Sequence, residues 1–381
     1  MKKKYLEFFY LLILGCITSF GLPPYNFTLV CFLTLSLLFV FIIRKKINFS
    51  NKKGFFSYGW FFGFGYFISS LYWVSISLTF DQNFNFLIPF ALILIPSFLA
   101  IFYGTATYVF SFFNLKNEIS YFFLLSLLFG CAEFLRGILF TGFPWNLFAF
   151  SFSKNLEIIN LVSYIGSYSF NLICISILAS SSVFIIKKNK KNFLISLILL
   201  ITPLLFYHFG SLKIKKFNLI EKKENNFTIR AIGSNISMNR FYDVSNQSNV
   251  LEELIFLSKP NKDKKIIFIW PEGIVPGLSK EEIIKYKNLF IENFNNNHLI
   301  GLGLNSTSFV EGKEKIFNSF ALYDHRLNLI YLYNKLNLVP FGEFLPFEKV
   351  LNKFGLKTIT NNYRSYSKGK VRNLIEIKNK S

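Results

Sequence analysis

The chain has 381 residues, of which 52% are hydrophobic and 51 are phenylalanine. This composition is too apolar for a soluble domain of such length and indicates a membrane protein. Lys and Arg number 42 against 21 Asp and Glu. Residues 1–209 hold only 15 of these basic residues, almost all in a few short loops, which argues against nucleic acid as the partner.

Apolar runs long enough to cross a bilayer fill the first half of the chain. A spanning helix needs about 20 apolar residues. We predict seven spans, near 8–22, 26–43, 55–74, 86–112, 119–140, 158–186 and 193–209. Residues 1–209 are therefore expected to form a transmembrane domain of about seven helices.

The loops between these spans predict an orientation. With a cytoplasmic N-terminus, the inside loops hold 13 Lys and Arg, whereas the outside loops hold only Lys154. Basic residues collect on the cytoplasmic side of membrane proteins. An odd number of spans then places everything after residue 209 outside the cytoplasm.

Two features of the membrane region have both a structural and a functional interpretation. Glu133 and Arg136 lie three residues apart in one span, so they share a helix face and form either a structural ion pair or part of a substrate site. The loop at 140–146, which includes Trp145, is either an interfacial aromatic anchor or a wall that contacts lipid. The glycines of Gly59-x-x-x-Gly63-x-Gly65 have helix-packing spacing, and we predict a packing role.

The cysteines and histidines do not predict a metal site. Cys16, Cys31, Cys131 and Cys174 all lie inside apolar segments, where thiols are usually inert packing groups. The three histidines are isolated in the sequence. We predict no metal.

From Lys213 onward, polar segments alternate with short apolar ones, which is typical of a layered α/β domain. Strands are expected at 227–235, 265–270, 298–304, 317–323 and 328–334, and helices at 247–258, 279–294 and 347–354.

Two of these strands deliver ionisable groups at their ends. Glu272 follows the strand 265–270 at once, and Lys335 follows the strand 328–334. Glu343 comes eight residues after Lys335 on a turn shaped by proline and glycine. A lysine fixed at a strand end can stabilise an oxyanion, and a nearby carboxylate can act as a base. The sequence therefore predicts an active site at the edge of a sheet.

Trp-Pro-Glu at 270–272, Asn-Lys at 334–335 and Leu-Val-Pro-Phe-Gly-Glu at 338–343 resemble the apolipoprotein N-acyltransferases, membrane members of the nitrilase (carbon–nitrogen hydrolase) superfamily. The run 133–145 resembles the family's substrate-cavity border. The resemblance implies a nitrilase-like αββα sandwich at 220–381, with Glu272 as general base, Lys335 as oxyanion stabiliser and Glu343 as a second essential acid. It implies that Arg136, Trp145 and Glu133 contribute to substrate binding.

The resemblance also implies a reaction and a location. An acyl chain passes from a phospholipid donor to a thiol, and then to the amino group of a diacylglyceryl-modified lipoprotein, with no dissociable cofactor. The expected location is the bacterial inner membrane, with the catalytic domain on the periplasmic side. Two alternatives remain open: a membrane-anchored amidase of the nitrilase class, and a non-enzymatic transporter or sensor.

One departure concerns the nucleophile. The family uses a cysteine on a later strand, whereas this sequence has no cysteine after Cys174. We therefore expect a C-terminally truncated sandwich and no acyltransferase activity from these 381 residues alone.

Overall fold

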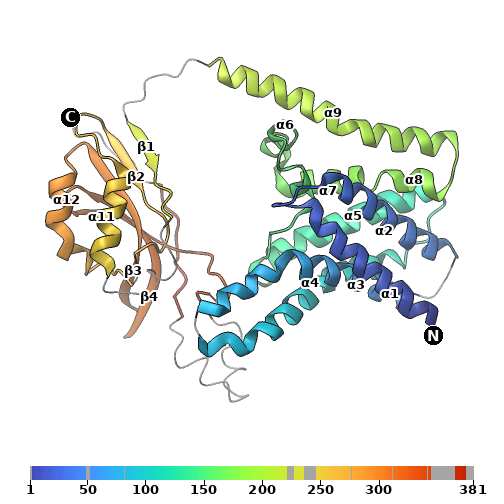
Figure 1. The fold of residues 1–381 in the computed structure, drawn as a ribbon, viewed down its shortest axis with the longest axis horizontal. Coiled ribbons are helices and arrows are strands. Elements are labelled where there is room, and N and C mark those ends of the chain that lie inside the picture. Colours follow the sequence, from blue (N-terminus) through green and yellow to red (C-terminus); the bar gives the residue numbers. More distant parts are fainter. Residues whose placement is uncertain are drawn as a thin grey trace. The chain divides into compact units, whose positions relative to one another are not determined.

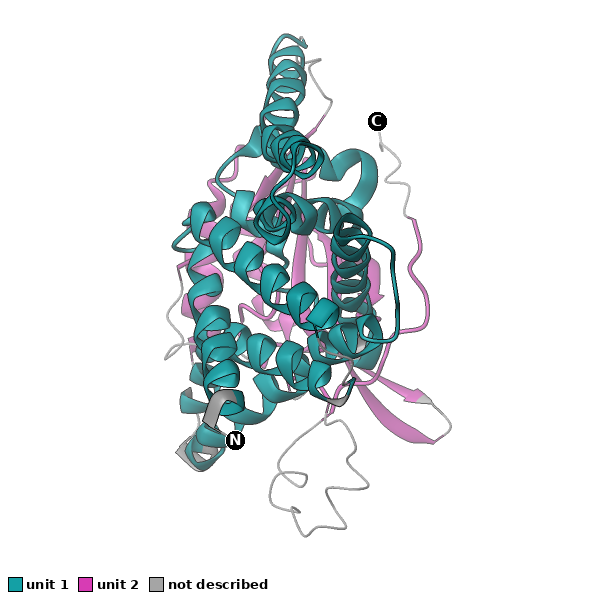
Figure 2. Cartoon of the chain, turned by 90° about the vertical axis from the view of Figure 1, so that its right-hand side faces the viewer, with its two compact units in different colours: residues 1–221 teal, residues 222–381 magenta. Residues whose placement is uncertain are grey.

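The computed structural model forms two compact units, residues 1–221 and 222–381 (Figure 2). It describes residues 2–48, 52–80, 82–220, 227–235, 246–275, 277–310, 312–340, 342–344 and 365–374. The predicted helix at 347–354 lies outside the described residues.

Unit 1 is helical (Figure 1). Its longer helices are α1 (Lys2–Thr18), α2 (Thr28–Asn48), α3 (Lys53–Leu71), α4 (Ile88–Phe110), α5 (Glu118–Ile138), α7 (Val162–Leu178) and α9 (Lys190–Asn218). Shorter helices are η1 (Ser19–Gly21), η2 (Tyr72–Phe80), η3 (Gln82–Leu87), η4 (Leu139–Thr141), η5 (Phe148–Phe152), α6 (Leu156–Ile159) and α8 (Ser181–Ile186). Seven helical stretches in the described part of the chain are long and apolar enough to cross a membrane, which confirms the predicted number.

Asparagine caps define where two of these helices begin. The side chain of Asn117 accepts a hydrogen bond from the backbone N–H of Ser120 at 2.8 Å, at the start of α5. Asn189 does the same for the N–H of Asn192 at the start of α9. Each cap satisfies a donor that the first helical turn leaves without a partner.

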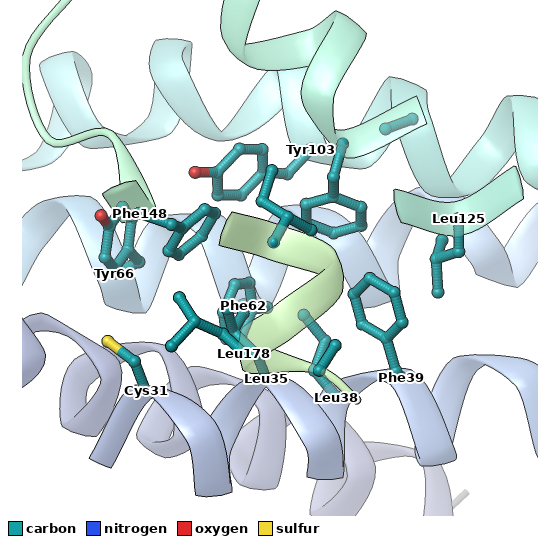
Figure 3. Packing of buried hydrophobic residues seen from close by; sticks show 14 of the residues in the cluster. Cys31, Leu35, Leu38, Phe39, Phe62, Tyr66, Tyr103, Leu125, Phe148 and Leu178 are labelled. Atoms are coloured by element: carbon teal, nitrogen blue, oxygen red, sulfur yellow. The ribbon is translucent and has the colours of Figure 1, made fainter. Parts of the chain in front are cut away.

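Unit 1 packs around an aromatic core that includes Phe39, Phe62 and Tyr103 (Figure 3). The glycines of α3 allow the close approach of two neighbours. A Cβ on Gly59 would meet the backbone oxygen of Tyr103 on α4, and one on Gly65 would meet the backbone oxygen of Leu12 on α1. These contacts confirm the packing role predicted for the glycine motif.

Unit 2 contains a five-stranded sheet with the order β1-β2-β3-β4-β5. The strands are β1 (Thr228–Ala231), β2 (Ile266–Ile269), β3 (His298–Val310), β4 (Lys313–Asp324) and β5 (Leu329–Asn334). The β1–β2 and β2–β3 pairs are parallel, and the β3–β4 and β4–β5 pairs are antiparallel. Strand β5 therefore runs in the same direction as β2.

Two helices pack with the sheet in one apolar core. Helix α11 (Gln247–Ser258) contributes Leu251 and Leu254, and α12 (Lys287–Asn293) contributes Phe290. Trp270 lies against Phe290 and donates a hydrogen bond from Nε1 to Ser258 Oγ at 2.9 Å. A membrane helical domain followed by an α/β domain is thus confirmed, and the described residues supply one helix layer on one sheet.

Several element boundaries differ from the sequence prediction, and β1 is shorter than the expected 227–235. The helix expected at 279–294 is reduced to the short helix η7 (Ile283–Tyr286) and α12, because the backbone at 278–280 bonds with Asn305 of β3 instead. Strands β3 and β4 are longer than expected and form a hairpin. Gly312, with a φ of +72°, suits the connecting turn because glycine adopts positive φ without steric cost.

Candidate active site

Sheet topology brings the predicted catalytic residues to one edge. Strands β2 and β5 run in the same direction, so their carboxyl ends lie at the same edge of the sheet. Glu272 follows the end of β2, and Lys335 follows the end of β5. The two residues are 63 positions apart in the sequence and in contact in space.

The ammonium of Lys335 lies between two carboxylates. Its Nζ is 2.9 Å from Glu272 Oε1 and 3.0 Å from Glu343 Oε1. The Glu343 side chain is 11% exposed, whereas the Glu272 side chain is 61% exposed. Glu343 is therefore the buried partner of the lysine, and Glu272 is the partner that solvent can reach.

Asn318 joins this cluster, and sequence reasoning did not identify it. From β4, its Nδ2 donates to Glu272 Oε1 at 2.7 Å and to Glu343 Oε1 at 2.5 Å. The backbone oxygen of Asn318 accepts from the N–H of Lys335 at 2.9 Å. One asparagine thus positions all three charged residues.

The turn that carries Glu343 is closed by that residue itself. Glu343 Oε2 accepts from the backbone N–H of Val339 at 2.7 Å, and the N–H of Glu343 donates to the oxygen of Val339 at 2.8 Å. Residues 365–374 also lie against the site. The N–H of Gly369 donates to the oxygen of Lys335, and the N–H of Tyr366 donates to the oxygen of Glu343.

The local electrostatics favour ionised groups. The hydrogen bond from Lys335 lowers the pKa of Glu272 despite partial burial, and Asn318 adds to this effect. Partial burial alone would lower the pKa of Lys335, but the hydrogen bonds that Lys335 donates to Glu272 and Glu343 outweigh it and raise that pKa. At neutral pH the site therefore presents a carboxylate beside an ammonium.

Gly303 packs so closely against the backbone at Glu272 and Gly273 that a side chain at position 303 would not fit. A Cβ added to Gly303 of β3 would lie 2.9 Å from the nitrogen of Gly273 and 3.1 Å from the Cα of Glu272. Gly273 itself has a φ of +61°. Glycine at both positions lets the chain turn sharply after β2 and holds Glu272 against β3.

The predicted membrane residues form a separate group in unit 1. Arg136 and Glu133 are fully buried and form an ion pair on α5. The hydroxyl of Tyr103 donates to Glu133 Oε1, and Arg136 Nη1 donates to the oxygen of Phe143 at 2.6 Å. The pair therefore ties α5 to α4 and to the loop that follows η4.

Trp145 is the exposed member of this group. The residue is 49% exposed, and its ring stacks on that of Trp73 with centroids 5.2 Å apart. The centroid of its ring also lies 5.3 Å from that of Phe143, and the Arg136 guanidinium lies 5.9 Å from the same Phe143 centroid. Of the three predicted substrate-binding residues, only Trp145 has surface that a ligand can touch in this conformation.

None of the four cysteines of the sequence belongs to unit 2. They lie on α1, α2, α5 and α7, and Cys31 and Cys174 are buried in the core of unit 1. All four stretches are apolar enough to cross a membrane.

Comparison with known proteins gives a consistent family. A family described as the apolipoprotein N-acyltransferase N-terminal domain matches residues 14–180. A Rickettsia prowazekii protein named apolipoprotein N-acyltransferase is 30% identical over 364 residues, which cover 94% of this chain and 70% of the relative. A Rhodopseudomonas palustris protein of the same name is 26% identical over 97% of this chain and 70% of its own length.

The match to both relatives extends across the two units, because it covers nearly the whole chain. A Brucella suis protein of the same name is 25% identical over 84% of this chain. The apolar helices, the acid–lysine–acid cluster and these similarities agree with one another. The chain belongs to the apolipoprotein N-acyltransferase family.

Proposed function

We propose that this protein serves the N-acylation of lipoproteins, and that the cluster of Glu272, Lys335 and Glu343 is its catalytic centre. The observation that supports this assignment best is the ammonium of Lys335 held between two carboxylates, one buried and one exposed. Such a cluster provides a base and a fixed positive charge within one hydrogen-bond length of each other.

In the first half-reaction, Glu272 takes the proton of a thiol, and the thiolate attacks the ester carbonyl of a phospholipid. Lys335 stabilises the negative charge on the tetrahedral oxygen. When the carbon–oxygen bond of the ester breaks, Glu272 returns the proton to the departing alkoxide, which leaves a thioester and a lysophospholipid.

In the second half-reaction, the amino group of a diacylglyceryl-modified lipoprotein attacks the thioester. Glu272 takes a proton from the nitrogen and gives it to the departing thiolate. The products are an amide on the lipoprotein and the free thiol. Glu343 and Asn318 keep Lys335 and Glu272 aligned through both steps.

The thiol is not one of the four cysteines in this chain. They lie on apolar stretches suited to a membrane interior, whereas the candidate catalytic centre has a water-accessible carboxylate. We therefore propose that the 381 residues alone do not transfer acyl chains.

Lipid substrates also account for the membrane unit. Trp145 offers an exposed aromatic surface to acyl chains, and the buried pair of Glu133 and Arg136 supports substrate binding by holding the loop that carries it. The proposed location is the bacterial inner membrane, with the N-terminus in the cytoplasm and residues 222–381 on the periplasmic side. The 13 to one distribution of Lys and Arg between the two sets of loops supports this orientation.

The catalytic assignment can be tested in cells depleted of their own apolipoprotein N-acyltransferase. The protein is expressed in a form that also supplies the catalytic cysteine, and triacylated lipoprotein is measured by mass spectrometry of the modified N-terminal peptide. Glu272→Ala and Lys335→Ala should each lower acylation by a factor on the order of a hundred or more. Lys335→Arg should not restore it, because the larger planar fork is aimed differently.

The control is Lys285→Ala, which removes an exposed lysine from η7 in the same unit. It should leave acylation unchanged. Near-normal acylation by Glu272→Ala or Lys335→Ala, at equal membrane levels, would remove that residue from the mechanism. Clear acylation by residues 1–381 expressed alone would overturn the assignment of the nucleophile.

The orientation has its own test. A cysteine at Asn51 should be shielded from an impermeant thiol reagent in intact spheroplasts, and a cysteine at Asn261 should be labelled. The opposite pattern would reverse the proposed topology without affecting the catalytic assignment.

A further inference from the structure

A groove lies along the second helix of unit 1. It has a volume of about 340 Å³, within the range of roughly 300 to 1,000 Å³ that holds small ligands. Its lining consists of Tyr10 from α1 and of Leu37, Val40, Phe41, Arg44, Lys45 and Asn48 from α2. The α2 residues recur at helical spacing, so they form one stripe on one face of that helix.

The two ends of this stripe differ in chemistry. Leu37, Val40 and Phe41 are apolar, and the ring of Tyr10 lies 6.0 Å from that of Phe41. Arg44, Lys45 and Asn48 follow toward the C-terminus of α2. At 1.5 Å per residue, the stripe from Leu37 to Asn48 is about 16 Å long, close to the ~15 Å depth of one leaflet's hydrocarbon layer.

Arg44 is held so that its charge faces outward. It is exposed, and its Nη2 donates to the oxygen of Ile185 on α8 at 2.9 Å. A guanidinium has five N–H donors in a planar fork, and this is the one hydrogen bond of the Arg44 side chain among the described residues. The bond fixes the fork, and the other donors remain for an oxygen-rich anion.

The neighbouring cation is more constrained. Lys45 Nζ forms an ion pair with Glu7 Oε1 at 2.6 Å and lies 5.4 Å from the centroid of the Phe41 ring. Glu7 offsets part of its charge, so Arg44 is the principal cation of the groove. Lys188, which is exposed, follows Ile185 closely in sequence and adds positive charge, whereas Lys187 forms an ion pair with Glu118.

We propose that this groove binds one anionic phospholipid, with its phosphate on Arg44 and the upper part of an acyl chain along Leu37, Val40 and Phe41. Basic pockets beside transmembrane helices recognise anionic headgroups in this manner. A free phosphate would pair with Arg44 but would leave the apolar stripe uncovered. A neutral lipid would cover the stripe but would leave the charge of Arg44 without a negative counter-charge. A single anionic lipid satisfies both ends.

This site is distinct from the catalytic centre of the proposed function. It lies at the end of α2 that the proposed orientation places on the cytoplasmic side, so the bound lipid belongs to the inner leaflet and is not the acyl donor. The leaflet rests on that orientation, but the binding does not.

The test is native mass spectrometry of the detergent-purified 381-residue chain, titrated with palmitoyl-oleoyl phosphatidylglycerol or with phosphatidylcholine of the same chains. One phosphatidylglycerol should bind saturably, and phosphatidylcholine should bind more weakly. Arg44→Gln should weaken phosphatidylglycerol binding about fivefold. Leu37→Trp, which keeps every charge but fills the apolar part of the groove, should weaken it as well.

Three controls make the result decisive. Lys116→Gln removes an exposed lysine from the loop between α4 and α5, outside the groove, and should bind as the unmodified chain does. Glu272→Gln should also bind normally, so a failure of the catalytic assignment leaves this site standing. Equal binding by the parent chain, Arg44→Gln and Leu37→Trp would overturn the site. Displacement of the lipid by millimolar inorganic phosphate would show that the groove binds the anion without the acyl chain. That result would also overturn the proposed lipid site.

Discussion

The buried pair of Arg136 and Glu133 offers a sharp test of how unit 1 is held together. Both side chains have no exposed surface. Removing one partner of a buried ion pair leaves the other charge without compensation, at a cost of about 3–5 kcal/mol. We therefore expect Glu133→Leu and Arg136→Leu each to lower the free energy of unfolding by that amount.

The double variant separates charge from packing. It removes both charges and leaves two buried groups without partners, the hydroxyl of Tyr103 and the backbone oxygen of Phe143. Each orphaned group costs about 1–3 kcal/mol. The double variant should therefore lose about 2–6 kcal/mol, clearly less than the roughly 6–10 kcal/mol obtained by adding the two single losses.

The assay is equilibrium unfolding of the purified protein in mixed detergent micelles, followed by far-UV circular dichroism. A matched control is the pair of Lys187 and Glu118, which are 3.5 Å apart with side chains 63% and 12% exposed. Its coupling energy should stay near 0.2–1 kcal/mol, because the Lys187 ammonium is largely exposed to solvent. If the losses at Glu133 and Arg136 add to within about 0.5 kcal/mol, the reasoning from burial is wrong.

The same variants address substrate binding. If the pair acts only by stabilising unit 1, acylation and thermal stability should decline together across the series. A fall in acylation at unchanged stability would show that the loop carrying Trp145 depends on the pair for substrate binding.

Three further results are expected. Gly59→Leu should lower the free energy of unfolding by at least about 1–3 kcal/mol, because its Cβ would meet the backbone of Tyr103. A variant that needs a higher concentration of denaturing detergent to unfold would contradict this packing. The hydrogen bond from Lys335 lowers the pKa of Glu272 in the folded protein. The stability that this carboxylate adds is therefore complete above its pKa in the unfolded chain, about 4.3, and is lost as the pH falls through the lower pKa of the folded state. The gap in thermal stability between the parent chain and Glu272→Gln should therefore shrink from pH 7 to about pH 3, and a constant gap would contradict the ion pair. In the cysteine-supplying form, Asn318→Leu should reduce acylation while membrane levels hold, and unchanged acylation would show that its two hydrogen bonds to the acids are dispensable.

The membrane unit could be predicted well because hydrophobicity along a helix is a local property. Each span is recognisable from its own 20 or so residues, and the number of apolar helices agrees with the structure. The partners of Glu133 could not be predicted in the same way. Tyr103 lies 30 positions away on another helix, and only the packing of α4 against α5 brings its hydroxyl to the carboxylate.

In unit 2, the residues at strand ends were recognisable but the residue between them was not. Glu272 and Lys335 each follow an apolar run, which is a sequence signal. Asn318 has no such signal, since it lies within a strand of a chain rich in asparagine, and its role depends on the register of β4 with β3 and β5. The shortened helix before α12 has a similar origin, because the backbone near Ser279 pairs with Asn305, a residue distant in sequence.

The strand order also has a consequence for synthesis. Each strand after β1 pairs with the strand made just before it, so the sheet can grow by addition at one edge as the polypeptide is synthesised. Glu272 emerges 63 residues before Lys335, an interval of about 3–13 s at ~5–20 residues per second. Once β4 has been made late in this interval, its exposed edge is a template for pairing, and β5 covers it as it delivers the lysine. Protection from aggregation and completion of the charged cluster thus depend on the same strand.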